Sequence, residues 1–122
     1  MSDNAAPRSQ RQLRVGEEIR HALASIFLQE SFYEPSISSL SITVSEVRIS
    51  ADLRNATAFV LPLGGNAPAD FLETLGRITP QIRHYLSKKV HMKYLPQIHF
   101  KMDKSYEYAQ KIDSLLEDIK PE

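Results

Sequence analysis

Hydrophobic and polar residues follow one another along this chain in two rhythms, which predict helices and strands in a definite order. Over residues 12–30 the apolar residues recur at helical spacing, which predicts an amphipathic helix. Over residues 40–50 they alternate with polar residues, which predicts a strand, and residues 56–63 form a second predicted strand. The alternation changes parity at Ser45-Glu46, which predicts a β-bulge in the first strand. The short link between the strands predicts an antiparallel hairpin.

The next stretch predicts two helices joined by a sharp kink. Asn66 can cap the first helix with Pro68 in its first turn. The expected inward-facing residues of that helix are Phe71, Leu72, Leu75 and Ile78. Proline lacks an N–H group, so Pro80 cannot continue the helix. Thr79 is a suitable N-cap, which predicts that a second helix begins there and runs to about Lys93.

Pro96 then opens a third strand, and residues 103–105 begin a final helix with an apolar stripe ending at Ile119. The order is therefore α-β-β-α-α-β followed by a C-terminal helix. It predicts a single α+β domain, with a three-stranded sheet and its helices on one face. We expect a flexible N-terminal arm over 1–10, the domain over 11–119 and a short tail over 120–122.

Composition narrows the classes of function. The chain of 122 residues has no cysteine, which excludes disulfides, thiolate metal sites and thiol catalysis. Its polar start is not that of a secretory signal, and no apolar run is long enough to span a bilayer, so we expect a cytoplasmic protein without a membrane partner. We find no motif of a phosphate loop, a serine hydrolase or a zinc protease. We therefore expect no enzyme activity, no cofactor and no small-molecule substrate.

The four histidines do not suggest a metal site. His84 and His91 lie two helical turns apart in the predicted helix, and the charged residues between them are basic. The other two, His21 and His99, do not pair with another histidine at ligand spacing. No metal is expected.

The distribution of charge is the strongest functional signal. The net charge of the whole chain is zero, yet residues 77–104 contain seven basic residues against one acidic residue, a net charge of +6. A protein with one basic region and an acidic remainder can bind a polyanion in one orientation. Solvated helix faces also carry many charges, so the alternative is a surface without a ligand.

The predicted kink gives this charge a possible geometry. A helix that starts at Thr79-Pro80 would leave N–H groups free near Gln81 and Ile82, and its dipole would favour a phosphate there. Arginine can clasp such a phosphate in a bidentate manner. The candidate RNA-binding residues are Arg77, Thr79, Arg83, His84, Lys88, Lys89, His91, Lys93, His99 and Lys101, with Arg8, Arg11 and Arg14 as further candidates. Tyr85 and Tyr94 could stack on bases, although the spacing of Tyr85 favours the core.

Two other classes of function also fit these patterns. Two helices joined by a sharp turn are compatible with a helix-turn-helix that binds DNA. A basic face can also dock an acidic protein, as in an interaction adaptor.

The chain resembles the ribosome-binding factor A family, whose fold is a type II KH-like domain. The resemblance rests on the hairpin TVSEVRISADLRNA from Thr43 to Ala56, on YLPQIHF from Tyr94 to Phe100, and on the order of elements. It covers nearly the whole chain. Where the family carries an Ala-x-Gly kink between its central helices, this chain has Ile78, Thr79 and Pro80. This difference favours the side chains of the basic helix as the main RNA contacts.

The resemblance implies a function that composition alone does not. It implies a monomeric factor that binds free or immature 30S particles and 16S ribosomal RNA during late maturation of the small subunit. It also implies a link to 16S rRNA processing and to growth in the cold. Members of the family have no enzyme activity of their own.

Overall fold

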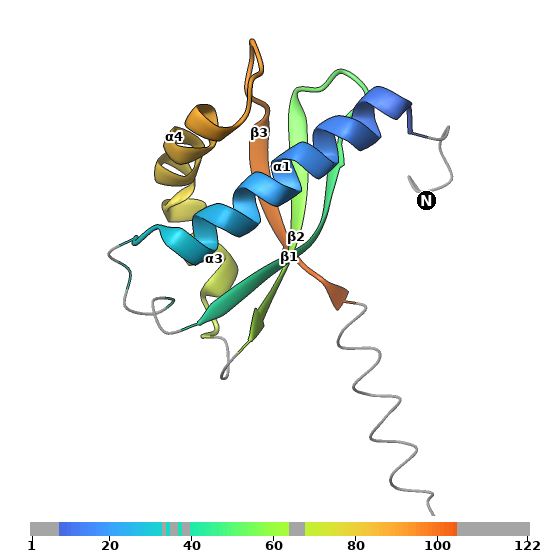
Figure 1. Cartoon of the computed structure of the whole chain (residues 1–122). Helices are drawn as coiled ribbons and strands as arrows, with labels where there is room; N and C mark the ends of the chain where they lie inside the picture. Colours follow the sequence, from blue (N-terminus) through green and yellow to red (C-terminus); the bar gives the residue numbers. More distant parts are fainter. Residues whose placement is uncertain (1–7, 33, 35–36, 38–39, 64–67, 105–122) are drawn as a thin grey trace, which may run out of the picture.

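The computed structural model describes residues 8–32, 34, 37, 40–63 and 68–104. The elements are α1 (Gln10–Gln29), β1 (Ser41–Ile49), β2 (Asn55–Leu63), α3 (Phe71–Arg77), α4 (Thr79–Lys89) and β3 (Gln97–Met102). Figure 1 shows α1, α3 and α4 packed against a sheet of three strands, so the predicted α+β class and element order are confirmed. The predicted cap at Asn66, the final helix over 105–119, and most of the N-terminal arm lie outside the described residues.

The sheet has the order β1-β2-β3, with β2 in the centre. β1 and β2 form the expected antiparallel hairpin, and their register shifts between Val44 and Glu46, where the bulge was predicted. β3 pairs with β2 in parallel, with Ala56 opposite Ile98. A parallel pair requires the chain to cross from one end of the sheet to the other, and α3 and α4 make that crossing.

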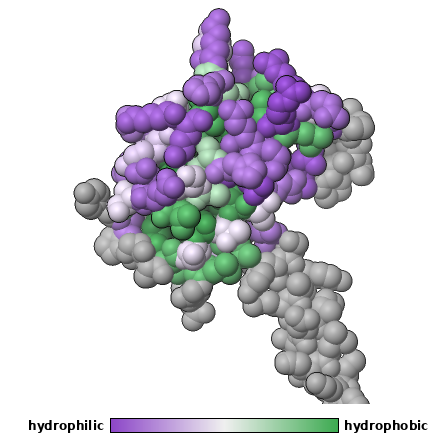
Figure 2. All heavy atoms as spheres, in the orientation of Figure 1, coloured by the Kyte–Doolittle hydropathy of each residue, from purple (hydrophilic) through white to green (hydrophobic). Residues whose placement is uncertain are grey.

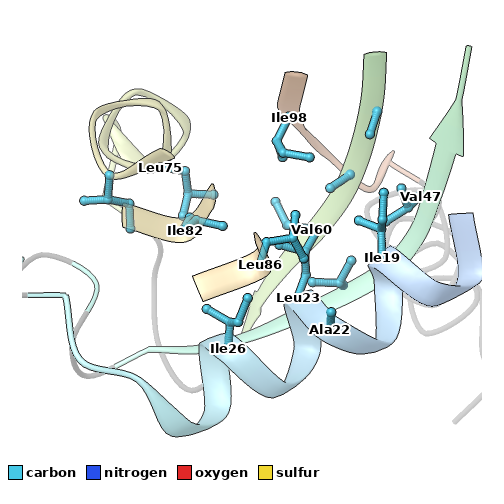
Figure 3. Packing of buried hydrophobic residues seen from close by; sticks show 14 of the residues in the cluster. Ile19, Ala22, Leu23, Ile26, Val47, Val60, Leu75, Ile82, Leu86 and Ile98 are labelled. Carbon is cyan, nitrogen blue, oxygen red and sulfur yellow. The ribbon is translucent and has the colours of Figure 1, made fainter. Parts of the chain in front are cut away.

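All the described helices lie on one face of the sheet, as expected, and the core fills the space between them (Figure 3). Ile19, Leu23 and Ile26 are fully buried on α1 because they recur at helical spacing. They belong to one core with alternate residues of the strands and the inward faces of α3 and α4, and α1 itself packs against β1 and α4. In the part of the chain that the structure describes, no helix is long and apolar enough to cross a membrane.

The two faces of the sheet differ in what covers them: the described helices pack on one face and leave the other uncovered (Figure 1). Figure 2 shows hydrophilic atoms over most of the helical side, with hydrophobic atoms gathered below α1. The opposite face of the sheet carries the alternate strand residues, among them the exposed Arg48, His99 and Lys101. No described helix covers that face, and we call it the open sheet face.

Three details of the helices differ from prediction. α3 begins only at Phe71, because residues 68–70 form a tight turn in which the Phe71 N–H donates to the Pro68 carbonyl at 3.1 Å. α4 ends at Lys89 and not near Lys93, because Val90 adopts an extended conformation and packs into the core. The predicted inward position of Leu72 is wrong: Leu72 is 38% exposed, and the buried face of α3 passes through Phe71, Thr74 and Leu75.

Candidate nucleic-acid interface

The kink between α3 and α4 consists of a single residue, Ile78, whose side chain is buried in the core. The Thr79 hydroxyl donates to the Leu75 carbonyl at 2.8 Å and makes no capping bond, so the prediction that Thr79 caps α4 is wrong. The Ile82 N–H, predicted to be free, donates to the Ile78 carbonyl at 3.0 Å. α4 therefore continues closely from α3, and the start of α4 offers fewer free donors to a phosphate than expected.

The two arginines near the kink already have partners within the protein. The Arg77 guanidinium donates to the Thr74 hydroxyl at 3.1 Å and lies 3.7 Å from the Glu34 carboxylate, while half of its side chain stays exposed. Arg83 is partly buried, and its guanidinium donates to the Pro96 carbonyl and, at 3.4 Å, to that of Leu95. Arg83 thus joins α4 to the segment that leads into β3, and both terminal nitrogens of its guanidinium donate to the protein's own backbone.

The remaining predicted cations of α4 are free of such contacts. His84, Lys88 and Lys89 are exposed, and neither lysine is paired with a carboxylate among the residues that the structure describes. His84 packs edge-on against the partly buried Tyr85, with ring centroids 5.7 Å apart. Tyr85 in turn contacts Phe32, which places it at the edge of the core rather than on a base-stacking surface. We call Lys88 and Lys89 the α4 cations.

Beyond α4, the predicted residues divide between two places. His91 and Lys93 lie in the exposed loop that follows the helix, because α4 ends earlier than predicted. His99 and Lys101 lie on the open sheet face, as their alternation with buried Ile98 predicted. The His99 Nε2 atom lies 3.1 Å from Asn55 Oδ1 on the neighbouring strand. The structure therefore places the α4 cations on the helical side of the sheet and Lys101 on the open sheet face, not on one continuous track.

The open sheet face contains a cationic group that the sequence did not single out. The Arg48 guanidinium lies 5.3 Å from the centre of the Phe59 ring, a cation–π geometry. Arg48 also donates to the Glu46 carboxylate at 2.9 Å, and Arg8 approaches the same carboxylate at 3.2 Å. Hydrogen bonds from Arg48 first, and also from Arg8, lower the pKa of Glu46. The sequence does contain a signal for this position: Arg48 lies between Val47 and Ile49 in the predicted strand, so its side chain is expected on the opposite face from theirs.

Arg8, Arg11 and Arg14, the further candidates, lie at the start of the described chain, and Arg11 and Arg14 are about one turn apart on α1. Arg8 is held at Glu46, whereas Arg11 and Arg14 are exposed on the first turns of α1. Arg11 lines a cleft of about 960 Å³ together with His91 and Lys93. Among the described residues, no group of histidines and carboxylates is arranged to hold a metal ion.

Comparisons with known proteins agree on one family. A family model described as ribosome-binding factor A matches residues 11–116. Ribosome-binding factor A of Paramagnetospirillum magneticum is 47% identical over 116 residues, which are 95% of this chain and 82% of that protein. Ribosome-binding factor A of Pelagibacter ubique is 49% identical over 110 residues, which are 90% of each chain.

Solved structures give the same result for the fold. The crystal structure of ribosome-binding factor A from Thermus thermophilus has a TM-score of 0.61 and 22% identity, covering 75% of this chain and 94% of that one. A homology model of the Thermus factor, fitted into a cryo-EM map of a complex with the 30S subunit, has a TM-score of 0.59 and 22% identity, covering 73% of this chain and 91% of that one. These likenesses show that the chain has the fold of ribosome-binding factor A, which is consistent with the expected KH-like domain.

The family is named for binding the ribosome, not for catalysing a reaction. The family match and the identity of the relatives together extend over nearly the whole chain. The chain therefore belongs to the ribosome-binding factor A family.

Proposed function

We propose that this protein binds immature 30S ribosomal particles, contacts 16S ribosomal RNA and acts late in the maturation of the small subunit. The relative from Thermus thermophilus that was fitted into a 30S complex supports the partner, and membership in the family supports the role. The protein acts as a cytoplasmic monomer and supplies no chemistry. It stabilises one conformation of the RNA because it binds that conformation more tightly than the alternative conformations of the same RNA.

The observation that carries this proposal is the exposed, unpaired state of Lys88 and Lys89 in the described structure. A lysine that is held by a carboxylate of its own chain has less to offer an RNA phosphate. These two lie in the last turn of α4, where the helix dipole already favours positive charge. The α4 cations are therefore available to a polyanion without breaking any described contact.

Binding of this kind follows the release of counterions from the RNA. If about five phosphates are neutralised, the logarithm of the binding constant falls with the logarithm of salt with a slope of about −4. A fourfold rise in salt then weakens binding by about a few hundred-fold.

Co-sedimentation with purified immature small subunits over a salt series tests the proposal. The variant Lys88→Glu/Lys89→Glu should lose most binding at moderate salt, whereas the matched control Lys88→Arg/Lys89→Arg retains both charges and should bind like the unaltered protein. Both variants should unfold at the same temperature as the unaltered protein, because both side chains are exposed. Equal binding by the charge-reversed and unaltered proteins at every salt concentration would refute a role for the α4 cations.

A role in late maturation has its own test. Cells that lack the protein should accumulate unprocessed 16S rRNA, with a stronger growth defect in the cold, where misfolded RNA rearranges more slowly. Expression of the Lys88→Arg/Lys89→Arg variant should correct both defects and the charge-reversed variant should not. Normal 16S processing in cells without the protein would contradict the role. Family membership favours this function over DNA binding and over an adaptor for acidic proteins.

A further inference from the structure

A cleft at the end of the molecule lies apart from the kink that was expected to meet RNA. It is formed where the N-terminal half of α1, the turn between β1 and β2, and the loop before β3 meet, and its volume is about 960 Å³. In Figure 1 that loop projects at the top of the molecule, beside the β1–β2 turn. The loop that lines the cleft follows the C-terminal end of α4, an 11-residue helix. The kink lies at the N-terminal end of the same helix. The two places are thus separated by about 16 Å of helix.

One wall of the cleft is a turn held in an unusual conformation. Leu53 has a φ of 61°, in the left-handed region that a leucine rarely adopts. The Ser50 hydroxyl and the Arg54 N–H both donate to the Asp52 carboxylate, at 2.6 and 3.0 Å. The Leu53 N–H donates to the Ser50 carbonyl at 2.9 Å. Such a network fixes the turn, so Leu53 and Arg54 are presented to the cleft in one arrangement.

The other wall carries an aromatic ring that contributes little to the core. Tyr94 is 76% exposed, far more than the partly buried Tyr85. The Lys93 ammonium lies 5.5 Å from the centre of its ring, a cation–π geometry. An exposed ring with an adjacent cation is the arrangement on which proteins stack the bases of single-stranded nucleic acids.

The lining of the cleft combines two chemistries. Apolar groups come from Val15, Leu53, Met92 and Leu95, which are all partly buried. Cationic groups come from Arg11, Arg54 and Lys93, and the facing carboxylates are Glu18 and Asp52. The three cations outnumber the two carboxylates by one charge, and a carboxylate oxygen of Asp52 already accepts two hydrogen bonds within the turn. A nucleotide could use both, with its base packed against the apolar groups and its phosphate bound by the cationic groups.

We propose that this cleft binds an unpaired nucleotide of RNA, with its base against Tyr94 and its phosphate near Arg11, Arg54 and Lys93. The proposal rests on the proposed function, because it places a second contact on the same RNA partner. A base inside a duplex is stacked and cannot enter a cleft of this kind, so the site selects single-stranded RNA. The α4 cations contact phosphates of either form and do not make this selection.

Fluorescence anisotropy with a labelled single-stranded RNA octamer, alone and annealed to its complement, tests the proposal. We expect the unaltered protein to prefer the single strand. Tyr94→Ala should weaken single-strand binding about tenfold without changing the salt slope, because stacking releases no counterion. Tyr94→Phe keeps the ring and should bind within about twofold of the unaltered protein. Lys93→Gln should lower the salt slope by about one unit.

The outcomes separate this proposal from the general one. If Lys88→Glu/Lys89→Glu abolishes binding to small subunits while Tyr94→Ala binds the octamer normally, the cleft proposal is wrong and the proposed function stands. If Tyr94→Ala weakens binding to subunits but not to the octamer, the cleft meets a ribosomal protein, and the nucleotide is excluded. Equal affinity of the unaltered protein for single strand and duplex would also overturn the proposal. Circular dichroism should show all variants folded, since Lys93 and Tyr94 are exposed.

Discussion

Gly16 on α1 lies so close to the carbonyl oxygen of Val47 on β1 that a Cβ atom at Gly16 would approach that oxygen to 2.6 Å. Real Cβ atoms essentially never come so near a backbone oxygen. The absence of a side chain thus lets the helix rest directly on the first strand. This contact sets the distance between α1 and the sheet, and with it the fit of Ile19 and Leu23 into the core.

Replacing Gly16 with alanine should destabilise the protein. Alanine favours a helix over glycine by about 1 kcal/mol, but pushing α1 away from β1 costs about 1–3 kcal/mol in packing. We expect the second effect to prevail and the free energy of unfolding to fall, by up to about 2 kcal/mol. Urea denaturation followed by circular dichroism measures it.

Gly76 on α3 provides the matched control, because a Cβ there would meet nothing within 4 Å. Gly76→Ala should leave stability unchanged or raise it by up to about 1 kcal/mol, through helix propensity alone. If both substitutions raise stability equally, the close contact between Gly16 and Val47 does not constrain the protein.

Arg83→Lys should weaken the connection between α4 and the segment before β3. Lysine is a point donor and cannot bond both the Pro96 and Leu95 carbonyls in the way that the guanidinium fork does. Two partly buried carbonyls would lose a charged donor, so we expect a loss of about 1–2 kcal/mol in the free energy of unfolding. Lys88→Arg, an exposed change in the same helix, should stay within about 0.5 kcal/mol. A stable Arg83→Lys protein would show that Arg83 is not needed for this connection.

The β1–β2 turn should make stability depend on acid. Hydrogen bonds from the Ser50 hydroxyl, and then from the Arg54 N–H, lower the pKa of Asp52. A group whose pKa is lower in the folded state stabilises the fold fully above its ordinary pKa of about 3.9, and this stabilisation is lost as pH falls through the lower folded value. Asp52→Asn should therefore unfold at a lower temperature than the unaltered protein at pH 7. Thermal melts from pH 7 to pH 2 should show the difference shrinking in acid; a constant difference would point to a cause other than ionisation.

The division of cations between two sides of the sheet predicts that they act independently. Lys101→Gln on the open sheet face and Lys88→Gln on α4 should each lower the salt slope for binding to small subunits by no more than about one unit. Their effects on affinity should add, because the two side chains are not in contact. If Lys101→Gln changes neither slope nor affinity, the open sheet face is not part of the interface. Effects of the double variant that differ from the sum by more than about 0.5 kcal/mol would indicate coupling.

The sequence predicted most helices and strands because their apolar spacing and turn residues lie within a few positions of one another along the chain. The bulge near Ser45-Glu46 was visible since a shift in parity moves side chains from one face of a strand to the other. Leu72 was misplaced because helical spacing admits neighbouring positions, and only packing showed that Thr74 takes the inward place on α3. The end of α4 was missed for a similar reason: the burial of Val90 in the core depends on where β3 lies.

The candidate site was less predictable than the fold. The sequence shows a basic region over residues 77–104, but it does not show which of its cations bond to the protein's own carbonyls and carboxylates. Arg83 reads as a surface arginine in the helix, yet its partners are carbonyls more than ten residues away. The cleft at Tyr94 forms where the loop before β3 lies beside the β1–β2 turn. These segments are far apart in the sequence, so only the folded chain brings them together.

The central position of β2 has a consequence for synthesis of the chain. β1 precedes β2 and pairs with it through a short turn, whereas the partner on its other side, β3, begins only at Gln97. During translation, the edge of β2 over residues 55–60 therefore stays unpaired until much of the remaining chain has been made. Exposed strand edges invite pairing with other chains. The protein should thus be most prone to aggregate as a nascent or refolding chain, and far less so once β3 has covered that edge.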